Sequence, residues 1–247
     1  MMSLTNRVAI VTGGGSGIGL GVASALAREG CRVVIAGRDP AKLERAAAEA
    51  TQAGGNGAVL ARVCDVTDRE ALADLVAWTQ THAGPPEIVV NSAGINVMRR
   101  SMAELAPADF DRLVAVNLTG LFNVLQAVLP GMRARRDGLI VSIASIAGRR
   151  ALPLAGPGYC ASKFGAAGLA GTVGIEERAH GIRVSSIHPG EVDTPILEQR
   201  PEPVPAERRA AMVHPEDIAA CVVMLAKLPA HVIVPELVIT PTYQPFA

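Results

Sequence analysis

The chain has 247 residues, of which 49% are hydrophobic and 3% aromatic, and its 23 Lys and Arg balance its 23 Asp and Glu. This length and composition favour a single globular domain over residues 1–247 and exclude a mostly disordered chain. Zero net charge argues against a nucleic-acid partner, and the lack of ~20 unbroken apolar residues argues against a membrane span. We therefore expect a soluble, cytoplasmic protein.

The four cysteines are scattered, with no Cys-x-x-Cys spacing and no paired histidine nearby. This pattern predicts reduced packing residues, with neither a metal site nor a disulfide framework. Short arginine runs at 99–100, 133–136, 149–150 and 208–209 are expected on solvated faces and loop turns.

Short apolar runs alternate with longer segments of helical period along almost the whole chain. The runs predict strands at 8–11, 32–36, 59–63, 88–90, 139–143, 184–187 and 237–239. The longer segments predict helices at 17–29, 40–53, 68–82, 107–134, 159–180 and 215–225. This alternation is typical of βαβ units, so we predict an α/β Rossmann fold, with a doubly wound, seven-stranded parallel sheet and helices on both faces.

A glycine-rich turn joins the first predicted strand to the first predicted helix. Glycine permits positive φ and lets the backbone approach a pyrophosphate, whose charge is stabilised by the N–H groups at a helix start. The spacing is G-x-x-x-G-x-G and not the commoner G-x-G-x-x-G, so the position between strand and helix carries the argument. The residues expected to bind a dinucleotide here are Gly13, Ser16, Gly17, Ile18 and Gly19.

The end of the second predicted strand bears on the choice of cofactor. An acid at this place would bond the ribose 2′-hydroxyl of NAD, but the chain has Gly37, followed by Arg38, which can bind a 2′-phosphate. NADP(H) is therefore expected, with NAD(H) as the alternative through Asp39, whose competing role is to cap the next helix. Asp65 and Val66, after the third strand, are further cofactor candidates; Asp65 either accepts a bond from adenine or is a turn residue.

Tyr159 and Lys163 lie four residues apart in a predicted helix, which places them on one face. With 2 Tyr and three Lys in the chain, chance predicts only ~0.02 such pairs. A neighbouring ammonium lowers the pKa of a tyrosine and makes it a proton donor and acceptor. Ser145, at the end of the fifth strand, is expected to hold the substrate oxygen, and Asn117 is either a surface residue or part of the site.

Together these residues resemble the short-chain dehydrogenase/reductase family over essentially the whole chain. The matching segments are Thr12-Gly13, Gly17, Gly19, Asn91-Ser92-Ala93-Gly94, Asn117, Ser145, Tyr159, Lys163, Pro189-Gly190 and Thr194. The resemblance implies hydride transfer between a nicotinamide and a substrate carbon. It also implies that Tyr159 is the catalytic acid/base, that Lys163 bonds the nicotinamide ribose and lowers the tyrosine pKa, and that Ser145 polarises the carbonyl. Asn117 would hold a water in a proton relay with Lys163.

The same resemblance implies further cofactor contacts. Asn91 and Gly94 would shape the adenosine side of the cleft, and Val192 and Thr194 would bond the nicotinamide carboxamide. The added set is Asn91, Ala93, Gly94, Pro189, Gly190, Val192 and Thr194. The chain departs from the family pattern at Ser92 (more often Asn), at Ala144 (the first Ser of a common pair), and in the 14 positions from Ser145 to Tyr159, one more than the commonest separation.

The predicted pocket walls are mostly apolar, which favours a small to medium, largely apolar ketone or secondary alcohol as substrate. The walls are Ile95, Asn96, Leu152, Pro153, Pro189, Glu191 and Ile196. Glu191 either faces a polar or cationic substrate group or points to solvent. Residues 191–211 contain four prolines that oppose both helix and sheet, so we expect either an irregular substrate lid or an exposed connection.

We therefore predict an NADP(H)-dependent oxidoreductase; the alternative is a nucleotide-binding regulatory or scaffold protein with little turnover. A sensor would need the glycine turn and Arg38 but not the tyrosine, lysine, serine and asparagine together. The C-terminal aromatics Tyr243 and Phe246 either pack against a partner subunit or fold back on their own chain. With the apolar helices 107–134 and 159–180, they favour a homotetramer, as is common in the resembled family, or a homodimer.

Overall fold

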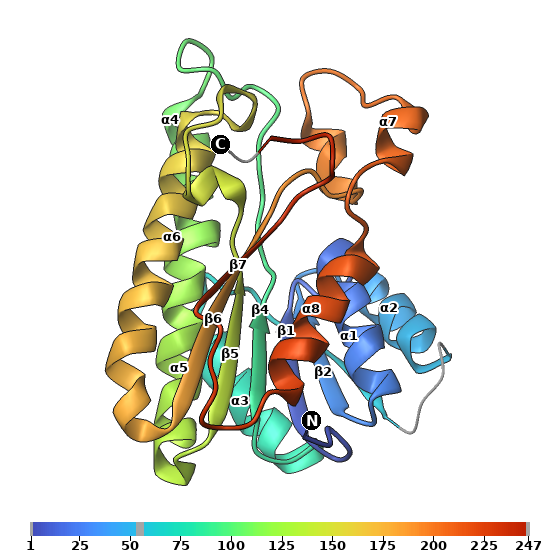
Figure 1. The fold of residues 1–247 in the computed structure, drawn as a ribbon, viewed down its shortest axis with the longest axis vertical. Helices are drawn as coiled ribbons and strands as arrows, with labels where there is room; N and C mark the ends of the chain where they lie inside the picture. Colours follow the sequence, from blue (N-terminus) through green and yellow to red (C-terminus); the bar gives the residue numbers. More distant parts are fainter. Residues whose placement is uncertain (1, 53–56, 246–247) are drawn as a thin grey trace.

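A parallel sheet of seven strands runs through the centre of the computed structural model, which describes residues 2–52 and 57–245 (Figure 1). The strand order is β3-β2-β1-β4-β5-β6-β7, so the predicted doubly wound sheet is confirmed. The strands are β1 (Val8–Thr12), β2 (Arg32–Gly37), β3 (Val59–Val63), β4 (Ile88–Asn91), β5 (Gly138–Ile143), β6 (Ile182–Pro189) and β7 (Glu236–Ile239).

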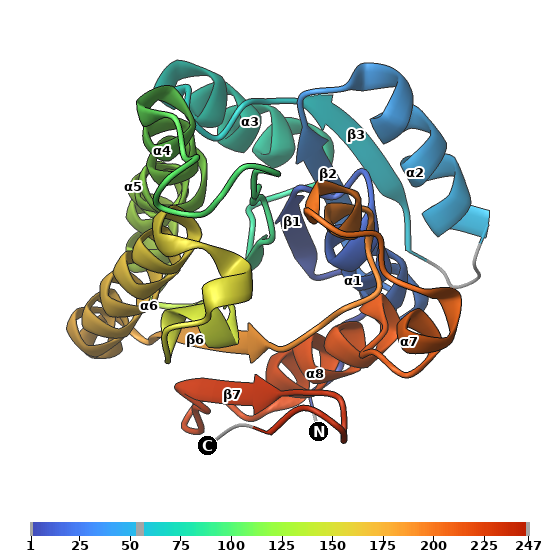
Figure 2. The same cartoon turned by 90° about the horizontal axis from the view of Figure 1, so that it is seen from above.

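Helices cover both faces of the sheet, as Figure 2 shows from above. The first face carries α1 (Gly17–Arg28), α2 (Pro40–Gln52) and α8 (Pro215–Lys227); the second carries α3 (Arg69–His82), α4 (Pro107–Val114), α5 (Gly120–Arg135) and α6 (Pro157–Glu176). Each face has its own buried apolar core, because strands covered on both sides must be apolar on both sides. This explains why the strands read as continuous apolar runs.

The predicted boundaries hold to within two residues, except at the carboxyl end of the predicted helix 159–180. Strand β6 is longer than predicted, since β5 and β7 pair with it on both sides. Helix α6 begins at Pro157, because proline fits the first helical position, and the segment that follows it is a 3₁₀ turn, η4 (Glu177–His180). The predicted helix end at residue 53 lies outside the described residues.

The predicted helix 107–134 is continuous but contains a π turn, η1 (Ala115–Thr119), between α4 and α5. By length and composition alone, Pro107–Arg135 is apolar enough to cross a membrane, yet half of its apolar window is buried inside the fold. Leu121, Val124 and Leu125 pack in the same core cluster as Val8 and Ile10 of β1. The segment Pro107–Arg135 therefore packs against the sheet as part of the hydrophobic core.

The segment 191–211 is irregular only in part, which partly corrects the prediction from its prolines. It contains a 3₁₀ helix, η5 (Pro195–Gln199), and a short helix, α7 (Ala206–Ala210). Pro195 occupies the first position of η5 and Pro205 precedes α7, and at these places proline removes no helical hydrogen bond. The segment lies at the carboxyl ends of the strands, beyond the top of α8 (Figure 1).

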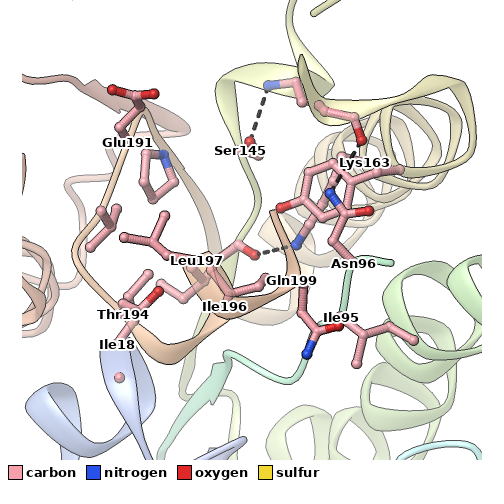
Figure 3. Close-up of a pocket in the computed structure, with 18 of the residues that line it drawn as sticks. Ile18, Ile95, Asn96, Ser145, Lys163, Glu191, Thr194, Ile196, Leu197 and Gln199 are labelled. Atoms are coloured by element: carbon pink, nitrogen blue, oxygen red, sulfur yellow. Dashed lines mark hydrogen bonds between the residues drawn. The ribbon is translucent and has the colours of Figure 1, made fainter. Parts of the chain in front are cut away.

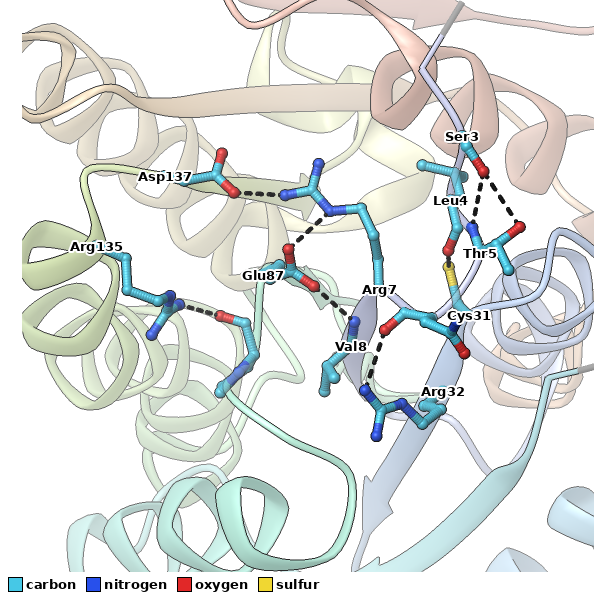
Figure 4. Close-up of polar contacts among 12 residues, drawn as sticks. Ser3, Leu4, Thr5, Arg7, Val8, Cys31, Arg32, Glu87, Arg135 and Asp137 are labelled. Atoms are coloured by element: carbon cyan, nitrogen blue, oxygen red, sulfur yellow. Dashed lines mark hydrogen bonds and ion pairs between the residues drawn. The ribbon is translucent and has the colours of Figure 1, made fainter.

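An ion cluster closes the opposite end of the sheet, as Figure 4 shows. Arg7 pairs with Glu87 at 3.0 Å and with Asp137, and Glu87 also accepts from the backbone N–H of Val8 at 3.1 Å. These residues join the start of β1, the start of β4 and the turn before β5. The amino ends of the strands are thus tied together, while the loops at the carboxyl ends are left to form a site.

Candidate functional site

A cavity of about 660 Å³ opens at the carboxyl ends of the strands. The strand order reverses between β1 and β4, and a crevice at such a reversal is where doubly wound sheets bind ligands. Its walls come from the loops after β1, β4, β5 and β6, and Figure 3 shows residues from these loops facing one another across it.

The glycine turn is shaped by close backbone contacts. Gly13 has φ +66, and a Cβ there would lie 2.9 Å from the backbone of Ser92 and Ala93. A Cβ on Gly19 would lie 2.3 Å from the Gly13 carbonyl oxygen, so neither position admits a side chain. Ser16 caps α1 with extended backbone, and its side chain makes no capping bond. The serine hydroxyl and the first N–H groups of α1 are therefore available to an anion.

The residues expected near the adenosine part of the cofactor bear on the choice between NADP(H) and NAD(H). Arg38 lines the cavity with an exposed side chain. Asp39 accepts from the backbone N–H of Lys42 at 3.0 Å, so its carboxylate has the predicted capping role. Asp65 accepts hydrogen bonds from the N–H and the hydroxyl of Thr67, at 2.9 and 2.8 Å. These bonds match the prediction that Asp65 is a turn residue. Within the described residues, the contacts leave Arg38 as the better placed partner for a ribose phosphate.

Polar groups join the ends of β1 and β4. The Thr12 hydroxyl donates to Asn91 Oδ1 at 3.0 Å and accepts from the Ala93 N–H at 3.3 Å. Asn91 is buried, so its side chain braces the crevice. Gly94 lies between the site residues, since a Cβ there would lie 3.5 Å from Asn117 Oδ1 and 3.6 Å from Lys163 Nζ.

Tyr159 lies in the first turns of α6, beside Ser145. Burial raises the pKa of Tyr159 to about 12, while hydrogen bonding with Ser145 and the positive charge of Arg100 oppose that rise. This is a correction, because the sequence predicted a lowered pKa through Lys163. Desolvation of the phenolate outweighs the hydrogen bond with Ser145 and the positive charge of Arg100, so the tyrosine is protonated at neutral pH.

Lys163 lies one helical turn below the tyrosine. Its Nζ donates to the Ile143 carbonyl oxygen at 3.0 Å and lies 5.7 Å from the centre of the Tyr159 ring. The side chain is buried, and burial lowers the pKa of Lys163 to about 8. Tyr159 and Lys163 therefore lie on the same face of α6, as predicted.

Asn117 is buried in the π turn η1, so the surface alternative is wrong. Its Oδ1 accepts from the Ile95 N–H at 2.8 Å, and its Nδ2 donates to the Ile95 carbonyl at 3.0 Å and to Ser162 Oγ at 3.0 Å. These contacts hold the loop after β4 against α6. They commit both Nδ2 hydrogens to protein acceptors.

Glu191 lines the cavity and is buried, so the expectation that it points to solvent is wrong. It is 7% exposed, and its carboxylate accepts from Arg200 at 3.0 Å, from Arg208 at 3.0 Å and from the Tyr243 hydroxyl at 2.6 Å. The Glu191 N–H donates to Gln244 Oε1 at 3.0 Å. Burial works to raise the pKa of Glu191, but these donors outweigh it and lower the pKa overall.

This arrangement, hereafter the Glu191 clasp (Glu191, Arg200, Arg208 and Tyr243), joins the segment 191–211 to the C-terminal segment. Tyr243 thus folds back on its own chain, which was the alternative to burial in a partner. Phe246 lies outside the described residues.

Sequence reasoning missed His188, which is fully buried in β6. Its Nδ1 lies 3.1 Å from the Ser145 carbonyl oxygen, and because a carbonyl accepts, Nδ1 carries the proton. Burial lowers the pKa of His188, so the ring is neutral and supports the backbone of Ser145. A lone histidine inside an apolar strand offered no signal of this contact.

Most of the predicted residues line one cavity. Those that do are Gly13, Ser16, Gly17, Ile18, Arg38, Gly94, Ile95, Asn96, Ser145, Leu152, Tyr159, Lys163, Pro189, Gly190, Glu191, Val192, Thr194 and Ile196. Gly19, Asp65, Val66, Asn91, Ala93, Asn117 and Pro153 are absent from its lining. Pro153 is a correction: it begins an exposed 3₁₀ turn, η3 (Pro153–Ala155), so Leu152 and Leu154 form this wall.

The structure adds polar residues that the sequence did not single out: Arg100, Arg112, Gln199, Arg200 and Gln244. Arg100 was expected on a solvated face, and this is wrong, because the side chain is 7% exposed. The segment 191–211 places Gln199 and Arg200 in the cavity wall, and Gln244 lines the cavity because the C-terminal segment folds back.

Comparisons with known proteins identify what the chain resembles. A family model described as short chain dehydrogenase matches residues 7–204. An uncharacterized oxidoreductase of Staphylococcus aureus is 35% identical over 243 residues, covering 98% of this chain and 100% of that protein. The glycine betaine reductase of Emericella nidulans is 35% identical over 247 residues, but the chain spans only 19% of its length.

Solved structures agree with this picture. A levodione reductase superposes with a TM-score of 0.87 at 30% identity, covering 96% of this chain and 97% of that one. A metagenomic short-chain oxidoreductase in complex with NADP superposes with a TM-score of 0.83 at 32% identity, covering 98% and 100%.

Proposed function

Since the chain belongs to the short-chain dehydrogenase family, we propose that it is an NADP(H)-dependent oxidoreductase that interconverts a carbonyl and a secondary alcohol, with Tyr159 as acid/base. The observation that carries the proposal is one cavity that runs from the glycine turn and Arg38 to Tyr159, Ser145 and Lys163. A regulatory or scaffold protein would have no use for the tyrosine end of this cavity.

The residues present fit a dinucleotide. The approach of Gly13 to the backbone of residues 92 and 93, and the unbonded Ser16 side chain, form a cradle for a pyrophosphate at the start of α1. Arg38 would bind the 2′-phosphate of NADP(H), the cofactor named for the metagenomic neighbour, and NAD(H) is the alternative.

Thr194 lies against the glycine turn, because a Cβ on Gly17 would lie 3.2 Å from the Thr194 side chain. It would bond the nicotinamide carboxamide with Val192, and Pro189 and Gly190 would form the wall beside it. Ile18, which lines the same crevice, would contact the cofactor from the start of α1.

The protein residues would handle the proton and the alignment, while the bound nicotinamide supplies or accepts the hydride. Ser145 and Tyr159 would both donate hydrogen bonds to the substrate oxygen, which polarises the carbonyl. Because the raised pKa keeps Tyr159 protonated at neutral pH, it can deliver its proton to that oxygen during reduction. Lys163 would bond the nicotinamide ribose and hold a positive charge near the phenolate that remains. Asn117 would take part in a proton relay with Lys163 through a water.

The proposal also covers a substrate lid, the oligomeric state and the cellular location. Residues 191–211 would close over the substrate as a lid. Phe122, Phe164 and Ile175 are exposed on α5 and α6, and they would pack between subunits of a homodimer or homotetramer; sedimentation as a monomer at micromolar concentration would contradict this. The four cysteines are free, as suits a protein of the reducing cytoplasm.

The experiment that tests the function measures oxidation of NADPH and NADH against a panel of ketones, aldehydes, diketones and quinones, with Tyr159→Phe as control. Turnover that prefers NADPH and falls by at least about a hundredfold in the variant is expected. Binding of a cofactor without turnover in either direction would favour the regulatory alternative.

A further inference from the structure

The cavity wall is strongly cationic. Among the described residues that line it, one carboxylate, Glu191, stands against five cationic side chains, which are Arg38, Arg100, Arg112, Lys163 and Arg200. The proposed function uses Arg38 for the cofactor and Lys163 beside the tyrosine. It gives Arg100, Arg112 and Arg200 no part in binding cofactor or substrate, although Arg112 pairs with Asp109 at 3.3 Å and Arg200 with Glu191 at 3.0 Å.

Arg100 is the most buried of these arginines, at 7% exposed. Its Nη1 donates to the Leu154 carbonyl at 3.3 Å and its Nη2 to the Gln199 carbonyl. Its Nε is buried without a hydrogen-bond partner, and no carboxylate of the described residues forms an ion pair with it. Two carbonyl dipoles do not neutralise a full charge, so a buried cation of this kind favours an anionic partner from outside the chain.

Arg100 lies beside the catalytic helix. Its side-chain stem packs against Gly156, where a Cβ would lie 2.8 Å from Arg100 Cβ. Gly156 directly precedes α6, which carries Tyr159, and the charge of Arg100 acts on the Tyr159 hydroxyl. Arg38, in contrast, follows β2, next to the glycine turn that follows β1. The guanidinium of Arg100 therefore belongs to the substrate side of the tyrosine.

Arg200 adds a second positive charge to the same place. Its side chain is 15% exposed, and its Nη2 bonds Glu191, but Arg208 and Tyr243 share that carboxylate. Arg100 bonds the carbonyl of Gln199, the residue before Arg200, and both arginines line the same cavity. Burial lowers the pKa of Arg100, and the charge of Arg200 adds to this effect, as expected for two neighbouring cations. The one carboxylate of the Glu191 clasp leaves this pair with a net positive charge.

We infer that the substrate carries a carboxylate, as keto acids and hydroxy acids do, and that this group binds between Arg100 and Arg200 while the carbonyl faces Tyr159. The inference rests on the proposed function for the carbonyl end of the substrate. It replaces the largely apolar substrate expected from the sequence. The planar, multidentate donor set of arginine suits a carboxylate, and binding would remove the repulsion between the two guanidiniums. The carboxylate itself is unchanged when the ketone becomes a secondary alcohol.

The probes are 4-oxopentanoate, 5-oxohexanoate and 6-oxoheptanoate, each compared with its methyl ester. In each pair the ketone is the same and the charge differs, and the series varies the distance between carbonyl and carboxylate. Calorimetry measures their binding to the Tyr159→Phe variant loaded with NADPH, where turnover does not consume them. We expect the best-fitting acid to bind at least about tenfold more tightly than its ester.

Substitutions in the same background assign that preference to the arginines. Arg100→Gln and Arg200→Gln should each reduce the ratio of acid to ester affinity by about tenfold, and Arg100→Lys should retain part of it because the charge remains. Arg99→Gln, which changes an exposed neighbour, is the matched control and should leave the ratio as it is.

Three results would overturn the inference: an ester that binds as tightly as its acid, a ratio unaffected by both glutamine variants, or a loss confined to NADPH affinity. The second would make Arg100 a structural brace for the lid, and the third would assign the arginines to the cofactor phosphates. Wild-type turnover of the same pairs separates this inference from the proposed function. If the acids bind in a way that depends on Arg100 but are not turned over, the anion site is supported and the proposed carbonyl reduction is contradicted. If acids and esters are turned over equally well, the proposed function is supported and the anion site is contradicted.

Discussion

The side-chain amide of Asn117 pairs with both backbone groups of Ile95, accepting from its N–H at 2.8 Å and donating to its carbonyl at 3.0 Å. The amide thereby makes the two backbone hydrogen bonds that a neighbouring strand would make to Ile95, which lies just beyond β4. The π turn that presents Asn117 costs helical regularity, and such turns are frequent at functional sites. The position of the cavity wall at Ile95 therefore depends on this single side chain.

Asn117→Asp should destabilise the protein by about 2–3 kcal/mol and lower kcat, because an acceptor oxygen would then face the Ile95 carbonyl. Urea unfolding and steady-state kinetics measure the two effects. Asn123→Asp is the matched control, since Asn123 is equally buried and bonds Val66 and Arg69 outside the cavity. It should lose stability while the folded fraction keeps its kcat, and an equal loss of kcat in both variants would contradict a specific role for Asn117.

Lys163→Met should make the cofactor-free protein more stable at pH 7 by about 2 kcal/mol, and inactive. Burial lowers the pKa of Lys163 from 10.5 to about 8, so at pH 7 the folded state bears the cost of a buried charge, less the hydrogen bond to Ile143.

The sign of the pH dependence follows from the same shift. Between pH 8 and 10.5 the unfolded chain binds the proton and the folded chain does not, so wild-type stability rises relative to the variant across this window. Urea unfolding at fixed protein concentration from pH 7 to 10 measures the difference. A gap that stays constant over this range would show that Lys163 is not charged and desolvated in the folded state.

Arg38→Ala should weaken NADPH binding by about 10- to 100-fold and NADH binding little, because it removes charge-assisted bonds to the 2′-phosphate alone. Fluorescence titration with both cofactors gives the ratio. Arg45→Ala, an exposed arginine on α2 outside the cavity lining, serves as the control. Equal weakening of both cofactors would place the 2′-phosphate elsewhere.

Glu191→Gln should loosen the segment 191–211. It removes the carboxylate shared by Arg200, Arg208 and Tyr243, and trypsin should then cut the segment 191–211 at least about tenfold faster. Because the folded-state pKa of Glu191 is lowered, the stabilisation is complete above the ordinary value of 4.5 and is lost as pH falls through the lowered pKa.

Asp193→Asn is the matched control for the lid, since it removes the partner of Arg209 and leaves the clasp intact. If both variants were cut at the same rate, the Glu191 clasp would not be what holds the segment 191–211 in place.

The sequence by itself determined the architecture, because the signals for it are local. A strand buried on both faces must be a short apolar run, a helix must repeat every 3.6 residues, and a phosphate turn needs glycine where the chain passes from one to the other. The four-residue spacing of Tyr159 and Lys163 is local in the same sense, since the geometry of one helix places both on one face.

Only the tertiary structure decided what depends on contacts between distant segments. Glu191 meets Tyr243 from 52 positions away, and Arg100 meets Gln199 from 99. No sequence periodicity encodes these contacts, so Arg100 was wrongly expected on a solvated face, and the partners of Glu191 could not be predicted although its place in the cavity wall was. The pKa of Tyr159 follows the same rule, because its direction is set by how much water the folded chain excludes, and that is a property of packing rather than of spacing.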